Sequence, residues 1–230
     1  MKRIAVFWIL LMSLTMTCQT KNSQDKEIVV PEFNKILDSL QVKGSILIYS
    51  FTDKKYYSNN FTWAKTGFIP ASTFKIPNSI IALETGVIKN ESDVFKWNGD
   101  ERWNKKWEQD LTFKDAFRVS CVPCYQEVSR KIGVEKMKTY LNKINYKGMV
   151  FDSTTIDNFW LYGESKITQI QQIQFLKRFY FSELPISKRT ESVLKNIMFV
   201  EKSADYTLSG KTGLSVKNEL YNGWFVGYFE

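Results

Sequence analysis

The 230-residue chain contains no histidine. A Ser-His-Asp triad is therefore impossible, and a serine nucleophile would need another base, for which a neighbouring lysine is one solution. Cysteine is also scarce, with 3 residues in the chain, which is too few for a framework of disulfides. A structural zinc site needs about four ligands, so the lack of histidine and of further cysteine excludes that class of site.

Two of the cysteines, Cys121 and Cys124, form a C-x-x-C pattern. Such a pair can be redox-active, and in an oxidising compartment it can close a strained local disulfide. It can also consist of two small buried side chains that are not bonded to each other. From the sequence we favour the unbonded pair.

The chain carries an excess of positive charge, with a formal net charge of +8 at pH 7. Its basic residues are scattered rather than run together, and no nucleic-acid recognition motif is present. We therefore predict no nucleic-acid partner. A basic site would instead suit an anionic small molecule.

The N-terminus has the layout of a secretory signal. The charged Met1-Lys2-Arg3 precedes an apolar stretch, Ile4 to Leu14, which is too short to span a membrane comfortably. We predict a signal peptide over residues 1–17 and export across the inner membrane to the periplasm.

The residues around Cys18 resemble a bacterial lipoprotein cleavage box, although Thr17 stands where Gly or Ala is usual. We predict a lipid on Cys18 that attaches the protein to the membrane, followed by a polar tether over residues 18–29. The alternative is ordinary signal cleavage beside an incidental cysteine.

The order of the predicted elements indicates an α/β fold of the α+β type. Strands are expected over 44–51 and 56–61, a long helical region follows, and strands return over 206–210 and 220–229. This order predicts an antiparallel sheet flanked by helices, with an all-helical region inserted into it. One domain over residues 30–230 would contain all of these elements.

The predicted helices have apolar residues repeating at a period near 3.6, which marks their buried faces. Capping signals begin three of these helices, and three tryptophans between strands and helices are interpreted as packing residues. The predicted buried faces are Phe33, Ile36, Leu37 and Leu40; Ile76, Ile80, Leu83 and Val87; Val134, Met137, Leu141 and Ile144; Ile170, Ile173 and Leu176; and Thr190, Val193, Leu194 and Ile197; the caps are Thr112, Thr168 and Ser187, and the tryptophans are Trp97, Trp103 and Trp107.

The segment Pro70-Ala71-Ser72-Thr73-Phe74-Lys75-Ile76-Pro77 holds the first catalytic candidates. Residues i and i+3 of a helix are neighbours on one face, so the amine of Lys75 can reach the hydroxyl of Ser72. A lysine with its ordinary pKa of about 10.4 is a poor base at neutral pH, so Lys75 must be desolvated or chemically changed. The S-x-x-K pattern alone favours instead a surface lysine one turn from a helix-capping serine, so companion motifs must decide.

Two further motifs follow in order along the chain. Ser120-Cys121-Val122 lies at a predicted junction between helical segments, and Lys211-Thr212-Gly213 follows a short predicted strand. A lysine and a threonine on a strand can bind a carboxylate, and a glycine lets a ligand approach the backbone closely. Each motif alone is weak, but the three in this order rarely arise by chance.

With these motifs the chain resembles a class D serine β-lactamase, within the wider group of penicillin-recognising serine enzymes. The similarity runs from about Val30 to the last residue. The matching segments are Pro70 to Pro77, Ser120-Cys121-Val122-Pro123-Cys124-Tyr125-Gln126, Phe159-Trp160-Leu161, Lys211-Thr212-Gly213 and Gly223-Trp224-Phe225-Val226-Gly227.

The resemblance implies a catalytic mechanism. Ser72 would attack the β-lactam carbonyl and become acylated. Lys75 would carry a carbamate formed from carbon dioxide and act as general base, and Ser120 would relay protons toward the leaving nitrogen. The backbone N–H groups of Ser72 and Leu214 would form the oxyanion hole. No metal or other cofactor is expected.

The resemblance also implies residues that surround substrate and base. Lys211, Thr212 and Gly213 would engage the substrate carboxylate. Trp160 would donate its indole N–H to the modified lysine. Phe74, Val122 and Leu161 would line the pocket of that lysine.

Two departures from the family pattern affect these expectations. The family usually has Tyr-Gly-Asn where this chain has Tyr146-Lys147-Gly148, so no site residue is assigned there. The family also continues past the position of Glu230 with a strand and a helix, which carry an arginine that commonly binds the substrate carboxylate. We therefore expect the domain to be truncated at its C-terminal side, with an exposed edge along the last strand.

Other functions remain open from the sequence. A penicillin-binding transpeptidase or carboxypeptidase would share the motifs. A β-lactam sensor domain would be acylated without turnover, although such sensors normally follow a multi-pass membrane region. An inactive fragment is the third alternative.

Overall fold

The computed structural model describes residues 26–217 and 219–230, so the predicted signal and Cys18 lie outside the described residues. Its strands are β1 (Lys26–Val29), β2 (Leu47–Ser50), β3 (Lys55–Ser58), β4 (Val94–Phe95), β5 (Leu111–Thr112), β6 (Phe199–Lys202), β7 (Thr207–Lys217) and β8 (Leu220–Phe229). Its helices are α1 (Phe33–Ser39), α2 (Phe61–Ala64), α3 (Lys75–Glu84), α4 (Phe113–Arg118), α5 (Val122–Ile132), α6 (Val134–Lys143), α7 (Gln169–Tyr180) and α8 (Lys188–Met198), with 3₁₀ turns η1 (Ala71–Phe74) and η2 (Lys105–Trp107).

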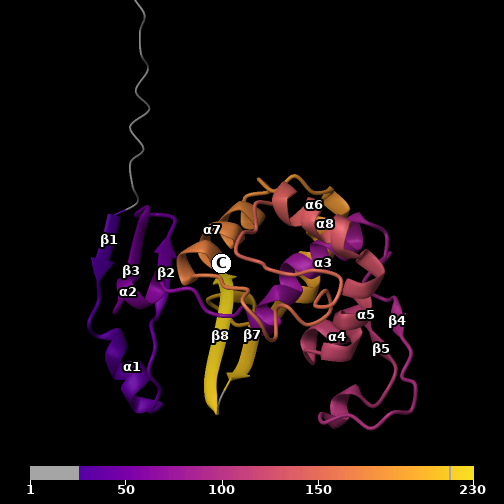
Figure 1. The fold of residues 1–230 in the computed structure, drawn as a ribbon. Helices are drawn as coiled ribbons and strands as arrows, with labels where there is room; N and C mark the ends of the chain where they lie inside the picture. Colours follow the sequence, from indigo (N-terminus) through magenta and orange to yellow (C-terminus); the bar gives the residue numbers. More distant parts are fainter. Residues whose placement is uncertain (1–25, 218) are drawn as a thin grey trace, which may run out of the picture.

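The fold is α+β, as the sequence predicts, with strands at both ends of the chain and helices between them (Figure 1). The early strands form a sheet in the order β1-β3-β2, in which β1 runs parallel to β3 and β2 runs antiparallel to it. The late strands form a separate antiparallel sheet in the order β6-β7-β8. Within the described residues β2 and β8 each pair on one side only, so the two sheets present free edges.

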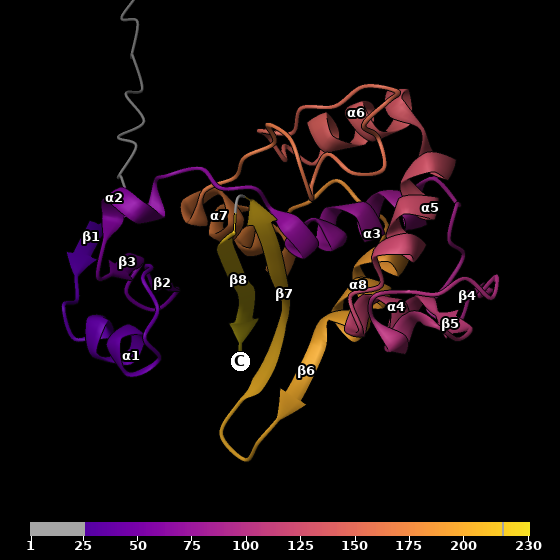
Figure 2. The same ribbon diagram turned by 60° about the horizontal axis from the view of Figure 1, so that its bottom comes forward.

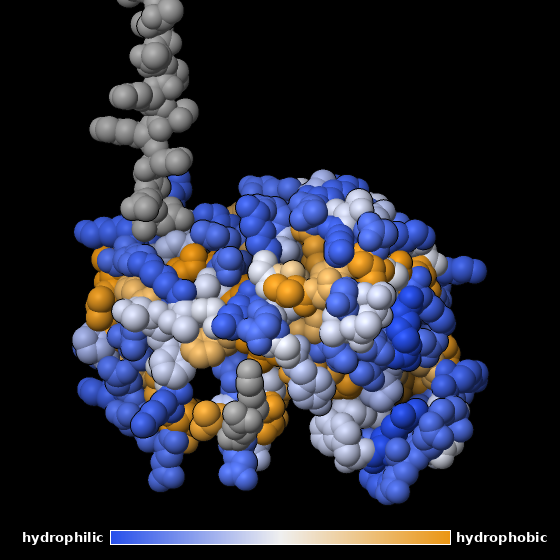
Figure 3. Space-filling view, viewed as in Figure 1, coloured by the Kyte–Doolittle hydropathy of each residue, from blue (hydrophilic) through white to orange (hydrophobic). Residues whose placement is uncertain are grey.

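A groove lies between these two edge strands. It has a volume of about 640 Å³, and β2, α7 and β8 line it. Tyr180 of α7 bridges the two sides, because its ring stacks on Phe51 after β2 and meets Tyr228 of β8 edge-on. Figure 3 shows apolar residues reaching the surface beside this hollow. None of the residues that line it belongs to the motifs around Ser72, Ser120 or Lys211.

The core is centred on α3, which packs against α5, α6 and α8 (Figure 1). Every residue of α3 from Lys75 to Leu83 is buried, including the predicted face of Ile76, Ile80 and Leu83. A helix buried all round needs neighbours on every side, and the surrounding helices provide them.

The predicted inward face of the first helix is wrong. α1 has no buried residue: its Ile36 is 52% exposed, and Leu40, directly after the helix, is 66% exposed. The other two predicted residues, Phe33 and Leu37, are only partly buried. Figure 2 shows α1 beside the small first sheet and away from α3. An amphipathic pattern buries a face only where a second layer covers it, and here none does within the described residues.

The predicted face of α7 is also displaced. The buried residues are Gln172, Phe175, Leu176 and Phe179, at the spacing i, i+3, i+4 and i+7, while Ile170 and Ile173 are only partly buried. The polar Gln172 lies on the buried side because it has hydrogen-bond partners there.

The predicted helix caps are confirmed. The side chains of Thr112, Thr168 and Ser187 each accept the backbone N–H three residues on, and Thr168 with Gln171 completes a capping box. Pro123 lies in the first turn of α5, where its missing N–H costs no helical hydrogen bond.

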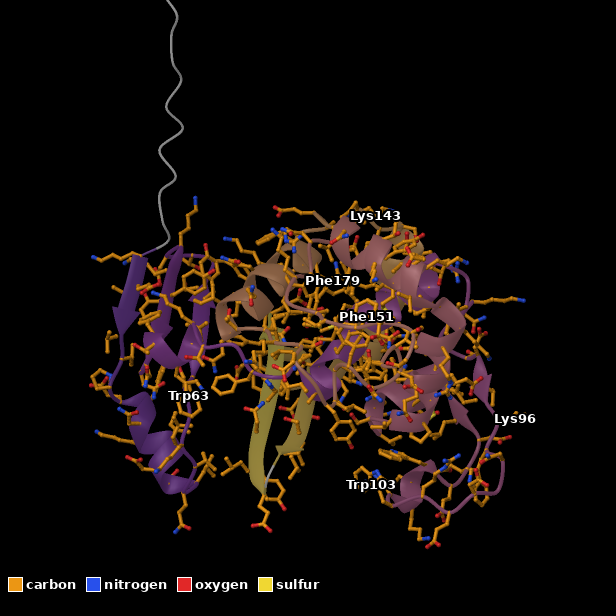
Figure 4. The ribbon with its side chains drawn as sticks, viewed as in Figure 1. Trp63, Lys96, Trp103, Lys143, Phe151 and Phe179 are labelled. Atoms are coloured by element: carbon orange, nitrogen blue, oxygen red, sulfur yellow. A yellow bond between two sulfur atoms is a disulfide. The ribbon has the colours of Figure 1, made fainter. Side chains whose placement is uncertain are left out.

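Of the three tryptophans predicted to pack, only Trp107 is buried. Its indole N–H donates to the carbonyl of Val119 at 3.0 Å. Trp103 is 83% exposed, and Figure 4 shows it at the outer end of the molecule, whereas Phe151 and Phe179 lie within the helical part. None of the described helices has both the length and the apolar character needed to cross a membrane.

Candidate active site

Ser72 lies in the 3₁₀ turn η1, which runs directly into α3. The turn is fixed by Thr73, whose backbone N–H and hydroxyl both donate to the carbonyl of Pro70, at 3.2 and 2.6 Å. Ala71 has a φ of +50°, which is strained for a residue with a side chain. Ser72 is the second residue of this turn, so its N–H is among those that a helix start leaves without an internal partner.

Lys75 is the first residue of α3, and it is 0% exposed. Its Nζ lies 3.0 Å from the Oγ of Ser72, as the i, i+3 spacing predicts. Burial, with a smaller contribution from the positive charge of Lys211, holds the pKa of Lys75 well below its ordinary value. A neutral amine beside the hydroxyl can accept its proton, so this pair has the geometry of a nucleophile and its base.

An aromatic ring lies beside the amine, since the ring of Tyr125 lies 5.0 Å from Nζ of Lys75. Phe74, the residue before Lys75, stacks on Trp160 with ring centres 5.5 Å apart. Trp160 is fully buried, yet its indole N–H has no hydrogen-bond partner among the residues that the structure describes. Buried donors are rarely left unpaired, so this one marks a place where an acceptor would be stabilised. The predicted pocket residues Val122 and Leu161 are partly buried against the same core.

Ser120 lies at the junction between α4 and α5, as predicted. Its φ of +57° is in the left-handed region. The hydroxyl has no hydrogen-bond partner within the described part of the chain, so Ser120 does not bond to Ser72 or Lys75 here. Two hydrogen bonds nevertheless fix α5 against α3: Ser79 with the hydroxyl of Tyr125, at 2.8 Å, and Asn78 with Ser129, also at 2.8 Å.

The prediction of two unbonded cysteines is wrong. Cys121 and Cys124 form a disulfide with their Cα atoms 5.5 Å apart. Cys121 is also the N-cap of α5, where its Sγ accepts the N–H of Cys124. The helical turn between these two residues brings their Cβ atoms close enough to bond, because α-carbons at 5.5 Å suit disulfide geometry.

The strand that carries Lys211-Thr212-Gly213 is longer than predicted. β7 continues through this motif to Lys217, where the sequence suggested an end at Gly210. The motif packs directly against η1, and a Cβ on Gly213 would lie 3.1–3.2 Å from Thr73 and Pro70. Glycine therefore lets the strand approach the turn that holds Ser72.

Leu214 can offer its backbone N–H to a ligand. Thr207 and Glu230 exchange both backbone hydrogen bonds, at 3.0 and 3.1 Å, and the pairing then continues in register along β7 and β8. Antiparallel pairs alternate between bonded and non-bonded, so Leu214, opposite Gly223, is at a non-bonded position. Its N–H therefore points away from β8.

Lys211 is the second buried amine of the site. Burial lowers its pKa to about 8. Its Nζ donates to the carbonyl of Thr212 at 3.1 Å and lies 5.6 Å from the centre of the Phe117 ring in α4. Among the described residues, no carboxylate contributes to the pKa of Lys211 or Lys75. The site thus holds two buried amines without a counter-ion.

The sequence analysis did not identify the residues that pack against η1 and hold it in place. The side-chain amide of Gln172 donates to the hydroxyl of Thr73 at 2.9 Å and so braces η1. Tyr146 is buried against Phe74, and its hydroxyl lies 3.5 Å from Gln172. The signal for Gln172 was present, because a polar residue on an otherwise apolar helix face usually has a specific partner. Among the described residues, no group of His, Cys, Asp or Glu is arranged to hold a metal ion.

Comparisons with known proteins agree with this geometry. The sequence model of the penicillin binding protein transpeptidase domain matches residues 40–230. The chain is 41% identical to beta-lactamase OXA-10 of Pseudomonas aeruginosa over 201 residues, which cover 86% of this chain and 75% of that protein. The crystal structure of the class D β-lactamase YbXI from Nostoc is similar at a TM-score of 0.84 and 43% identity, over 88% of this chain and 84% of that chain.

A more distant match is the regulatory protein BlaR1 of Bacillus licheniformis. It is 31% identical over 218 residues, which cover 94% of this chain but 36% of that protein.

The match of residues 40–230 to the penicillin binding protein transpeptidase domain places the chain in that group. Within that group it belongs to the class D β-lactamase family, whose members are serine hydrolases that need no metal cofactor.

Proposed function

We propose that this protein hydrolyses β-lactams through an acyl-enzyme on Ser72. The observation that carries the proposal is the buried Lys75, whose Nζ lies 3.0 Å from the Ser72 hydroxyl. Lys75, in the carbamylated form proposed below, takes the proton of Ser72 as Oγ attacks the lactam carbonyl. The N–H groups of Ser72 and Leu214 then stabilise the oxyanion, and Ser120 passes a proton to the leaving nitrogen.

The anionic group of the substrate binds at Lys211, with Thr212 and Gly213 beside it. A buried ammonium without a carboxylate partner is costly, and an incoming carboxylate supplies the missing counter-charge. The absence of any acidic contribution to the pKa of Lys211 supports this assignment within the described residues.

We further propose that Lys75 is carbamylated by carbon dioxide. Phe74, Val122 and Leu161 form the apolar pocket that keeps the amine neutral and therefore reactive toward carbon dioxide. The carbamate supplies a general base for acylation and deacylation. The orphaned indole N–H of Trp160 supports the proposal, because an anion buried in this pocket needs a donor.

Export and resistance complete the proposal. A signal over residues 1–17 and a lipid on Cys18 would hold the enzyme at the membrane in the periplasm, where it would protect the cell from β-lactams. The relatives named as β-lactamases support this setting. Palmitate labelling of the full chain, with Cys18→Ser as the control, tests the anchor.

The experiment that tests the function is intact-protein mass spectrometry after mixing with a penicillin, followed over time. A transient adduct on Ser72 is expected for a hydrolase. A permanent adduct would instead indicate a sensor or penicillin-binding domain, an alternative that the partial likeness to BlaR1 favours. No adduct would indicate an inactive protein, and an adduct on another serine would contradict the assignment of Ser72.

A further inference from the structure

The disulfide between Cys121 and Cys124 lies between two parts of the site. Cys121 directly follows Ser120, the proposed proton relay. Cys124 directly precedes Tyr125, whose ring lies 5.0 Å from Nζ of Lys75 and whose hydroxyl bonds to Ser79. Val122, between the two cysteines, is one of the residues proposed to line the pocket of Lys75. One covalent link therefore closes the short turn from which all three of these residues project.

Hydrogen bonds hold the two ends of that turn more firmly than its middle. Ser120 holds a left-handed φ of +57°, a conformation that costs free energy and persists only where the surroundings enforce it. Pro123 has no backbone N–H to donate. The N–H groups of Ser120 and Cys121 donate to the carbonyls of Phe117 and Ala116, at 3.2 and 2.8 Å, whereas the backbone bond from Tyr125 to the carbonyl of Cys121 is long, at 3.4 Å. The disulfide is thus a covalent restraint on the chain between Ser120 and Tyr125, added to these hydrogen bonds.

We propose that this disulfide is a redox-sensitive positioning site: closed, it holds Ser120 and the wall of the Lys75 pocket in place, and opened by a thiol reductant, it releases them. The inference rests on the proposed function for its effect on turnover, but its structural part stands on the disulfide and the turn alone. Neither cysteine touches the reacting atoms, so both act through Ser120 and Tyr125.

The opening step is thiol–disulfide exchange with a dithiol. A thiolate of the reductant attacks the Sγ of Cys124, which is 8% exposed against 2% for Cys121, and the Cys121–Cys124 bond breaks. Cys121 leaves as a thiolate and takes up a proton. The second thiol of the reductant then closes on the mixed disulfide, releasing Cys124 as a thiol, so two electrons pass to the protein. Because both cysteines are buried, we expect slow exchange that requires the first turn of α5 to open.

The test uses the full protein, oxidised or treated with dithiothreitol, and reads two quantities. Alkylation and peptide mapping count free thiols at Cys121 and Cys124, with Cys18 resolved on its own peptide. Hydrogen exchange then follows the peptide over 116–125, and stopped-flow mixing follows acylation by a penicillin. Reduction should raise amide exchange in this peptide and slow acylation about tenfold, since small misplacements of catalytic groups cost about that much or more. Reoxidation should restore both values.

A double variant separates the disulfide from the helix cap. Cys121→Ser with Cys124→Ala removes the bond but keeps a side-chain acceptor at the N-cap. This variant should match the reduced protein in amide hydrogen exchange over 116–125 and in the rate of acylation. Dithiothreitol should change neither quantity. In a Ser120→Ala background, reduction should slow acylation by a smaller factor than in the wild type, because the part of the effect that acts through Ser120 is already lost. A general loss of stability would slow acylation by the same factor in both backgrounds.

The outcomes distinguish this inference from the proposed function. The positioning site does not exist if dithiothreitol leaves the Cys121–Cys124 disulfide intact, or if it reduces the disulfide with no change in amide hydrogen exchange over 116–125. If exchange rises but acylation keeps its rate, the turn does not position Ser120, and the inference is equally overturned. If the oxidised protein forms no adduct, the proposed function fails, while the exchange measurement still decides whether the disulfide holds the turn.

Discussion

The first sheet with α1 and the helical part around α3 differ in how they use apolar residues. α1 has an amphipathic pattern but no fully buried residue, whereas α3 is buried along its length and includes a buried lysine. The difference lies in the neighbours, since α3 packs against α5, α6 and α8 while α1 lies beside a three-stranded sheet (Figure 2). Catalytic chemistry that needs a desolvated amine can therefore be built around α3 and not around α1.

The largest effect is expected at the nucleophile. Ser72→Ala should lower kcat/KM by on the order of 10⁴- to 10⁶-fold, as loss of a serine nucleophile does. Ser39→Ala at the exposed end of α1 is the matched control and should leave kcat/KM unchanged. Steady-state hydrolysis of a penicillin measures both, and a mutant that keeps a tenth of its activity would exclude Ser72 as the acylated residue.

Replacing the proposed base, Lys75, should have opposite effects on activity and on stability. Lys75→Met should abolish deacylation and also raise the melting temperature at neutral pH, because it removes an amine from an apolar pocket. The folded-state pKa of Lys75 is lowered, so between that pKa and about 10.5 the unfolded chain holds more protons, and the wild type gains stability as pH rises.

The stabilisation by Lys75→Met should accordingly shrink as pH increases through this window. Lys35→Met on α1 serves as the control, with no change in activity. Calorimetry from pH 6 to 10 in buffer freed of carbon dioxide, where Lys75 is an unmodified amine, makes the comparison. A Lys75→Met protein that melts lower than wild type at every pH would contradict the buried neutral amine.

Truncation of an isoleucine should cost more unfolding free energy in α3 than in α1. Ile80→Ala in α3 should cost about 2–5 kcal/mol of unfolding free energy, as for other fully buried isoleucines. Ile36→Ala in α1 should stay within about 0.5 kcal/mol. Urea denaturation gives both values, and equal losses would show that α1 is covered in solution.

The smallest effect is expected at Lys211. Its pKa of about 8 means that the ammonium is present below that pH and is lost above it. The KM for penicillins should therefore rise as pH increases through about 8, by roughly tenfold for a charge-assisted contact of about 1.5 kcal/mol. Lys211→Ala should have a high KM at every pH. A pH-independent KM in the wild type would remove Lys211 from substrate binding.

The parts of the site that follow from local spacing were predictable from the sequence. The Ser72–Lys75 contact needs only the i, i+3 geometry, and the caps at Thr112, Thr168 and Ser187 need only one turn of helix. Long-range partners were not predictable. Gln172 can be buried because its side-chain amide donates a hydrogen bond to Thr73, 99 positions earlier in the chain. The apolar repeat of α7 does not indicate that partner.

The predictions for the two cysteines and for the buried face of α1 were wrong for the same physical reason. Whether Cys121 and Cys124 bond depends on the turn that their backbone adopts, and whether Ile36 is buried depends on what covers α1. Neither property belongs to the local pattern of side chains. The separation of the strands into two sheets, with a groove between β2 and β8, is likewise a tertiary property.

The central claim is that the helical part keeps the amine of Lys75 neutral, so that carbon dioxide can convert it to a carbamate beside Ser72. The most direct measurement is the ¹³C spectrum of the protein equilibrated with ¹³C-bicarbonate, recorded from neutral to acid pH. We predict one protein-bound carbamate signal that is absent in Lys75→Met, weakened in Trp160→Phe and lost at acid pH, with turnover falling in parallel. A wild-type protein that hydrolyses penicillins at full rate with no such signal would contradict the claim.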